Sequence, residues 1–157
     1  KVDPRSVHTL IVGEHGDSEV ALWSCTSVGG LSLTNYCEKC GKCGAHNMQR
    51  LSELHDQVKN AAYTIIAKKG ATFYAVALAV SRIVSAILND ENSVLTVSSY
   101  LESGFDGELK DLYLSLPCVV NRHGVEKILH PDYTPEEKAA LIASGKALKE
   151  KLADLPK

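Results

Sequence analysis

The stretch VGEHGDSEV, residues 12–20, joins a predicted strand to a cluster of polar side chains. The preceding run VHTLIV, residues 7–12, is typical of a buried strand and stops at Gly13. His15 then stands between two glycines, which let a ligand approach the backbone closely, and carboxylates lie on both sides of it. Histidine exchanges a proton near neutrality because its ordinary pKa is about 6.5. We therefore interpret His15 as a candidate site residue, although a hairpin turn or a core histidine fits the spacing as well.

Composition limits the class of protein. The 157 residues, 45% of them apolar, predict one domain with one core. The 17 basic and 19 acidic residues nearly cancel, which favours neither nucleic acid nor a membrane surface as a partner. The longest apolar stretch, residues 71–88, contains Arg82, so we expect a buried or half-buried helix there and not a membrane span. Five cysteines, an odd number, favour reduced thiols and a cytoplasmic protein.

The first half of the chain predicts a second strand and two helices. Residues 18–27 partly alternate and form the expected strand, and a polar connection follows over residues 31–46. Apolar residues then recur at helical spacing along one face, at Leu51, Leu54, Val58, Ala61, Ala62, Ile65 and Ile66. Gly70 ends this helix, and a second helix follows at residues 74–88 after a joint at residues 69–72.

The second half predicts an antiparallel meander and a terminal helix. The expected strands cover residues 93–101, 111–120 and 125–129, with a tight hairpin at residues 121–124. Thr134, Pro135 and Glu137 form a predicted capping box, and the buried side of the helix that follows is expected at Leu141, Ile142, Leu148, Leu152 and Leu155. The fold class is α+β, with antiparallel strands packed against long helices.

Six motifs occur in the order and near the spacing that the bacterial L-lactate dehydrogenases show. They are GEHGDSE at residues 13–19, WS at 23–24, AAY at 61–63, KGAT at 69–72, SVLTVS at 93–98 and VVNRHG at 119–124. The chain thus resembles the carboxyl-terminal, substrate-binding half of that family, over nearly all of residues 1–157. The resemblance implies that the family's amino-terminal NAD-binding Rossmann domain is absent. The chain also begins at Lys1 and enters a strand at once, so we expect a piece of a longer polypeptide.

The resemblance implies an NAD-dependent enzyme that interconverts pyruvate and (S)-lactate by hydride transfer. His15 matches the family's general acid and base. This role suits an imidazole, because negative charge develops on the carbonyl oxygen of pyruvate as hydride arrives and an imidazolium can donate its proton there. Malate dehydrogenases and other 2-hydroxyacid dehydrogenases of the same superfamily remain alternatives, although residues 19–23 look more like the lactate enzymes.

Three more residues match functional positions of the family. Thr72 matches a threonine that lines the substrate pocket, with a helix cap as the alternative. Val76 matches an apolar wall near the nicotinamide, with core packing as an alternative that is compatible with it. His8 matches a histidine that binds the activator fructose 1,6-bisphosphate between subunits, with a solvent-facing histidine on an edge strand as the alternative. The family also implies a homo-oligomer, a tetramer in its usual form.

The sequence lacks a Gly-x-Gly-x-x-Gly turn to hold the NAD pyrophosphate. The family's aspartate partner of the histidine and its substrate-binding arginines would lie before Lys1. We therefore expect this chain alone to be inactive on pyruvate.

Cysteine spacing supports a second class of function, a thiol-binding or metal-binding module. Cys37, Cys40, Cys43 and His46 follow one another at three-residue steps, and thiolates with an imidazole can bind zinc. Structural zinc sites usually join two separated pairs, and an iron–sulfur site expects a fourth cysteine. Thiols that bind no metal therefore remain the favoured interpretation.

Overall fold

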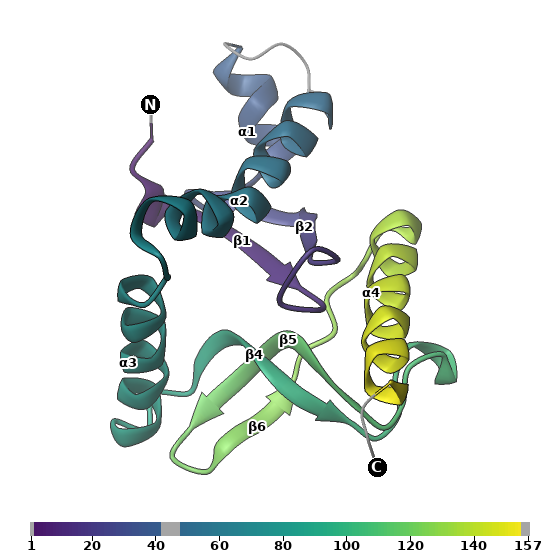
Figure 1. Cartoon of the computed structure of the whole chain (residues 1–157). Helices are drawn as coiled ribbons and strands as arrows, with labels where there is room; N and C mark the ends of the chain where they lie inside the picture. The colour runs from purple at the N-terminus through teal and green to yellow at the C-terminus, as the bar shows by residue number, and fades with distance from the viewer. Residues whose placement is uncertain (1, 42–47, 155–157) are drawn as a thin grey trace.

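A computed structural model of the chain describes residues 2–41 and 48–154. Within these residues the strands form two three-stranded antiparallel sheets (Figure 1). The first sheet has the order β1-β2-β3 and contains Val7–Val12, Val20–Val28 and Leu31–Ser32. The second has the order β4-β5-β6 and contains Ser93–Leu101, Leu112–Asn121 and Gly124–Ile128. The predicted meander and its hairpin are confirmed, since Asn121 pairs with Gly124 across a two-residue turn.

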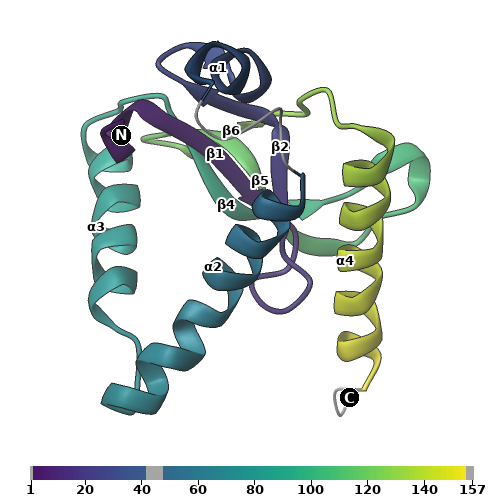
Figure 2. The ribbon, with the colours of Figure 1, turned by 90° about the horizontal axis from the view of Figure 1, so that it is seen from above.

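Four helices surround the sheets in the described residues: α1 at Leu33–Cys40, α2 at Met48–Lys69, α3 at Tyr74–Leu88 and α4 at Pro135–Ala153. Single 3₁₀ turns, η1 at Pro4–Ser6 and η2 at Phe105–Gly107, complete the elements. Figures 1 and 2 both place α3 and α4 on opposite sides of the molecule, with the strands between them. The predicted α+β class is confirmed, as antiparallel sheets with helices packed around them.

Helix α1 corrects the predicted polar connection over residues 31–46. Ser32 caps its start, because the Ser32 hydroxyl accepts a hydrogen bond from the Asn35 amide at 3.3 Å. Gly41 ends it in the left-handed conformation, and its amide donates to the Cys37 carbonyl at 3.2 Å. Two local caps thus stabilise a short helix that lacks the long apolar period by which helices are found in a sequence.

The core lies between β5, the end of β1 and α4. Alternate residues of β5, Leu112, Leu114 and Leu116, point into it, as the period of two predicts. Gly13 joins the two sheets, because its amide donates to the Ser115 carbonyl at 2.9 Å and the Ser115 amide returns a bond at 3.1 Å. The end of β1 is therefore fixed to the middle of the second sheet.

Helix α4 covers this core as predicted over its first turns. Its capping box is present, since the Glu137 amide donates to the Thr134 hydroxyl at 3.2 Å and the Thr134 amide to the Glu137 carboxylate at 3.1 Å. Leu141 is fully buried. The prediction for Leu152 is wrong, because the last turn borders an open cleft and leaves that side chain 52% exposed. Leu155 lies outside the described residues.

Helices α2 and α3 do not bury the apolar faces that their sequences predict. Ala86 is the one buried residue that the structure describes in α3, and α2 has none. Large apolar side chains on both helices are at least two-fifths exposed, among them Leu54, Val58, Ile65, Ile66, Val76, Leu78, Val80, Val84 and Leu88. The expectation that residues 71–88 are buried or half-buried is therefore wrong for most of this stretch and holds near its end, where Ala86 is fully buried and Ile87 packs against the core. None of the described helices combines the length and hydropathy needed to cross a membrane.

Candidate active site

Strand β1 ends in the core, and the loop that follows it places His15 at the surface. Val12, the last residue of the strand, is 1% exposed. Gly13 then adopts φ +93°, which side chains with a Cβ rarely tolerate, and turns the chain away from the strand. The loop at residues 14–19 closes on itself, since the Gly16 amide donates to the Glu14 carbonyl at 3.1 Å and the Glu19 amide to the Gly16 carbonyl at 3.2 Å.

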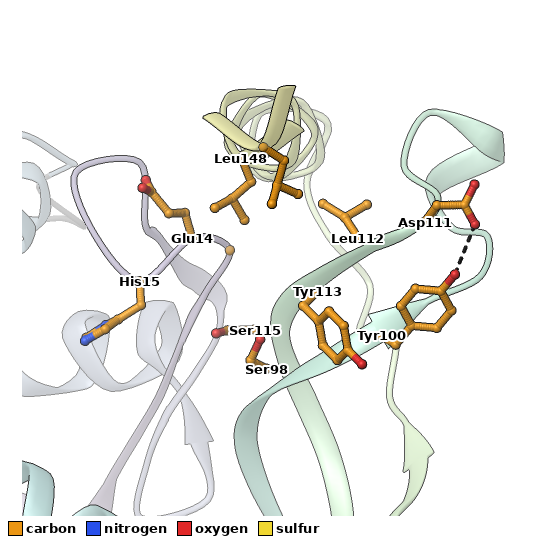
Figure 3. Close-up of a pocket in the computed structure, with 11 residues that line it drawn as sticks. Glu14, His15, Ser98, Tyr100, Asp111, Leu112, Tyr113, Ser115 and Leu148 are labelled. Atoms are coloured by element: carbon orange, nitrogen blue, oxygen red, sulfur yellow. Dashed lines mark hydrogen bonds between the residues drawn. The ribbon is translucent and has the colours of Figure 1, made fainter. Parts of the chain in front are cut away.

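The imidazole of His15 is exposed at the tip of this loop. Figure 3 shows its ring directed away from Tyr100 and Tyr113 of the second sheet. A rigid strand with an exposed histidine at its end offers a proton donor or acceptor to a molecule bound beside the loop.

Glu14, the neighbour of His15, is held as a carboxylate. One of its oxygens accepts hydrogen bonds from the Ser18 hydroxyl and from the Ser18 amide, the latter at 3.2 Å, and the other accepts from the Lys151 ammonium of α4. The ammonium of Lys151, followed by the Ser18 hydroxyl, lowers the pKa of Glu14 to about 2. Glu14 is thus held as an anion at neutral pH.

Two side-chain contacts connect the other side of the loop to α2. The Tyr63 hydroxyl donates to Asp17 at 3.0 Å, and this hydrogen bond raises the pKa of Tyr63. His55 Nε2 lies 3.5 Å from a carboxylate oxygen of Glu19, an ion pair when the imidazole is protonated. The sequence placed Tyr63 in the motif AAY at 61–63, but no local pattern could have paired it with Asp17.

A cleft of about 390 Å³ opens beside the loop, between the second sheet and the last turns of α4 (Figure 3). The tyrosine rings on its sheet side have centroids 5.4 Å apart, and the Tyr100 hydroxyl donates to Asp111 at 3.2 Å. Leu148 and Leu152 line its helix side. His15 is among the residues that line the cleft, but its imidazole points away from the two tyrosines on the sheet side.

Thr72 lies between α2 and α3, and Val76 lies in the first turn of α3. Thr72 is half-buried, and it is not the helix cap, because Phe73 occupies the N-cap position and its side chain makes no capping hydrogen bond. Val76 is 53% exposed, so the core-packing alternative is wrong for this chain. Neither residue is among those that line the cleft beside His15.

His8 is exposed on β1, opposite Ser27 of β2. Because β1 is the outer strand of its sheet, the edge-strand position is confirmed, and it leaves the ring open to a ligand.

Cys37 and Cys40 are half-buried and lie one helical turn apart on α1. Cys43 and His46 lie outside the described residues, and within the described part of the chain no three histidine, cysteine or acidic side chains are placed to hold a metal.

Comparison with known proteins decides the family. Residues 1–156 match the family described as lactate/malate dehydrogenase, alpha/beta C-terminal domain. The chain belongs to this family. L-lactate dehydrogenase 1 of Clostridium acetobutylicum is 51% identical over 153 residues, which are 97% of this chain and 47% of that protein. The chain spans about half the length of the curated relatives it matches.

Solved structures agree with the family. A minor L-lactate dehydrogenase from Enterococcus mundtii superposes with a TM-score of 0.86 at 45% identity, over 99% of this chain and 48% of the other. A lactate dehydrogenase from a deep-sea metagenome, MGS-M5, gives 0.88 at 35% identity, over 98% and 48%. The family fold is therefore the one described above. The sequence has no Gly-x-Gly-x-x-Gly turn of the kind that holds the pyrophosphate of a dinucleotide.

Proposed function

We propose that this chain is the substrate domain of an NAD-dependent L-lactate dehydrogenase that interconverts pyruvate and (S)-lactate, with His15 as general acid and base. The observation that carries the proposal is the exposed imidazole just after a strand whose last residue, Val12, is buried, in a loop where the neighbouring carboxylate of Glu14 is paired with Lys151. The family supports the same reaction, because relatives that match nearly all of this chain are named L-lactate dehydrogenases.

The role of His15 follows from the charge that develops on the substrate. Bound NAD would supply the hydride for reduction and accept it in oxidation. During reduction, protonated His15 donates its proton to the carbonyl oxygen as that oxygen becomes negative. During oxidation, neutral His15 accepts the proton of the lactate hydroxyl. Proton transfer of this kind accelerates reactions on the order of 10² to 10⁴-fold.

Three further roles belong to the proposal. The half-buried hydroxyl of Thr72 contacts the substrate, and the exposed side chain of Val76 lies near the nicotinamide in the assembled enzyme. His8 binds a phosphate of fructose 1,6-bisphosphate in a homo-oligomer of the tetrameric kind. Exposure of His8 on an edge strand supports this role, because a ring that faces a phosphate must be open to it. Replacement of His8 by glutamine then removes activation by that sugar phosphate without loss of basal turnover.

A chimaera tests the proposal. The amino-terminal half of the Clostridium acetobutylicum L-lactate dehydrogenase 1 is joined to residues 1–157, and oxidation of NADH is followed with pyruvate or oxaloacetate. We expect turnover with pyruvate in preference to oxaloacetate, and a loss on the order of 10²-fold or more in His15→Gln. His123→Gln, which changes a histidine in the β5–β6 turn, is the matched control and keeps full activity. Turnover that survives in His15→Gln contradicts the assignment, and preference for oxaloacetate favours a malate dehydrogenase.

The 157-residue chain by itself should not oxidise NADH with pyruvate, because its sequence has no turn of the kind that holds the cofactor's pyrophosphate. Activity of the purified chain that His15→Gln abolishes would contradict this expectation.

A further inference from the structure

Helix α4 contacts the His15 loop through buried polar atoms. Ser144 is 1% exposed, and its hydroxyl accepts a hydrogen bond from the Glu14 amide at 2.8 Å. The same hydroxyl lies 3.3 Å from the hydroxyl of Ser18. Lys151, two helical turns further along α4, binds the side chain of Glu14. The backbone and the side chain of the residue before His15 are therefore both held by one face of α4.

The glycine before Glu14 makes this close approach possible. A Cβ on Gly13 would lie 2.6 Å from the Ser144 hydroxyl oxygen, a separation that real side chains do not adopt. Since Gly13 is also hydrogen-bonded to Ser115 in both directions, the chain cannot move away from α4 without leaving the second sheet. The loop is thus held between a sheet and a helix.

The contacts of Ser144 and Lys151 with Glu14 differ in how much free energy their loss would cost. Ser144 is buried, so its removal leaves the Glu14 amide without its described acceptor in a place that water reaches poorly. Lys151 is 66% exposed, but the Glu14 side chain that it binds is only 11% exposed. Loss of the lysine therefore leaves a nearly buried carboxylate with Ser18 as its remaining described partner.

We propose that Ser144 and Lys151 are positioning residues that act through Glu14 to fix the imidazole of His15 in its reactive place. The inference rests on the proposed function, since it concerns the acid and base of that reaction. Neither Ser144 nor Lys151 touches the reacting atoms. Each holds Glu14, the residue next to His15. A displacement of about 1 Å at a reacting group costs on the order of 10²-fold in rate, so small freedom in this loop has a large effect on turnover.

Kinetics of the chimaera test the positioning role. Ser144→Ala should lower kcat about 10-fold to 100-fold and leave KM for pyruvate within about 3-fold, because the substrate is held elsewhere. Lys151→Met should lower kcat by a smaller factor, about 3-fold to 10-fold, and Lys151→Arg should restore most of it. Lys149→Met removes a lysine from the same helix at a position with no described contact to the loop, and should match the parent.

A pH profile separates positioning from general stability. Without Lys151 the pKa of Glu14 rises toward its usual 4.5. Protonation of Glu14 then weakens its hydrogen bonds to Ser18, so the deficit of Lys151→Met should grow as pH falls through about 4.5, whereas Lys149→Met should follow the parent throughout.

Hydrogen exchange gives a readout that needs no turnover. Peptides that cover residues 13–19 should exchange their amide protons faster in Ser144→Ala and in Lys151→Met than in the parent, with β5 unchanged. Faster exchange together with lower kcat supports the inference. Unchanged kcat, a change in KM alone or unchanged exchange in Lys151→Met overturns it. If the chimaera shows no turnover that depends on His15, the proposed function fails, and exchange in the loop still decides whether α4 holds it. If Ser144→Ala does not fold, the exposed Lys151 position carries the test.

Discussion

Helix α3 is apolar at most of its positions yet is largely exposed, whereas α4 carries many charged residues and yet covers the core. On α4, Leu141 is fully buried and the helix packs against β2 and β5. On α3, Leu78 and Leu88 are 73% and 78% exposed although the helix also contacts β5. An apolar stripe shows which face of a helix is suited to burial. It does not show whether the same chain supplies the surface that covers it.

The loop that contains His15, residues 14–19, contacts α4 on one side and α2 on the other. On the α4 side it is fixed by the buried hydroxyl of Ser144 and by Lys151. On the α2 side it meets Tyr63 and His55, on a helix with no buried residue. The loop is therefore anchored to α4 by a buried contact, whereas on its other side it contacts a helix that has no buried residue.

The largest expected effect is the difference in the free energy of unfolding between leucine-to-alanine substitutions on α4 and on α3. Leu141→Ala removes a fully buried side chain and should lower the free energy of unfolding by about 2 to 5 kcal/mol. Leu78→Ala, at a 73% exposed position of α3, should change it by about 0.5 kcal/mol or less. Urea unfolding of the two variants measures both values. Equal losses would mean that the α3 face is covered in solution, and the contrast between the helices would fail.

Acid should weaken the α4 side of the loop by a smaller amount. The folded pKa of Glu14 is about 2 and its usual value is 4.5, so its contribution is complete above pH 4.5 and disappears as pH falls toward 2. Because solvent screens the exposed Lys151, we expect about 1 kcal/mol from this group. Glu14→Gln should therefore destabilise the chain near neutrality and approach the parent near pH 2. Glu150→Gln, an exposed carboxylate on α4, is the control and should show no such trend.

The smallest effect is expected on the α2 side. Asp17 raises the pKa of Tyr63 through a hydrogen bond at the surface, so Asp17→Asn should return that pKa toward 10 with little change in the unfolding midpoint. Ultraviolet absorbance titration of Asp17→Asn measures the pKa of Tyr63, and the same titration of Tyr63→Phe gives the signal of the other tyrosines, which is subtracted. A large drop in the midpoint would show that α2 is held to the loop as firmly as α4 is.

Local patterns predicted most of this fold. Period-two alternation found β5 and its buried leucines, and the sequence Thr134-Pro135-Glu136-Glu137 predicted the capping box at its observed place. Helix α1 was missed because it is short and depends on two caps, Ser32 and Gly41. The exposure of Leu152 was missed because helical spacing does not tell where a helix passes the edge of the core.

The candidate site was less predictable than the fold. His15 could be found because its glycines and the end of its strand are adjacent in sequence. Ser144 and Lys151 lie about 130 residues from the loop, and nothing in their own neighbourhood distinguishes them from other polar residues of an amphipathic helix. Only the packing of α4 on the second sheet brings them to Glu14.

The pH dependence of the chimaera in both reaction directions tests the central claim most directly. If His15 is the acid and base, kcat/KM for pyruvate reduction falls as pH rises, kcat/KM for lactate oxidation falls as pH drops, and His15→Gln loses both dependences together with most of the turnover. The assignment of His15 would be contradicted if kcat/KM changed with pH in the same direction for reduction and oxidation, or if the pH dependence persisted in His15→Gln.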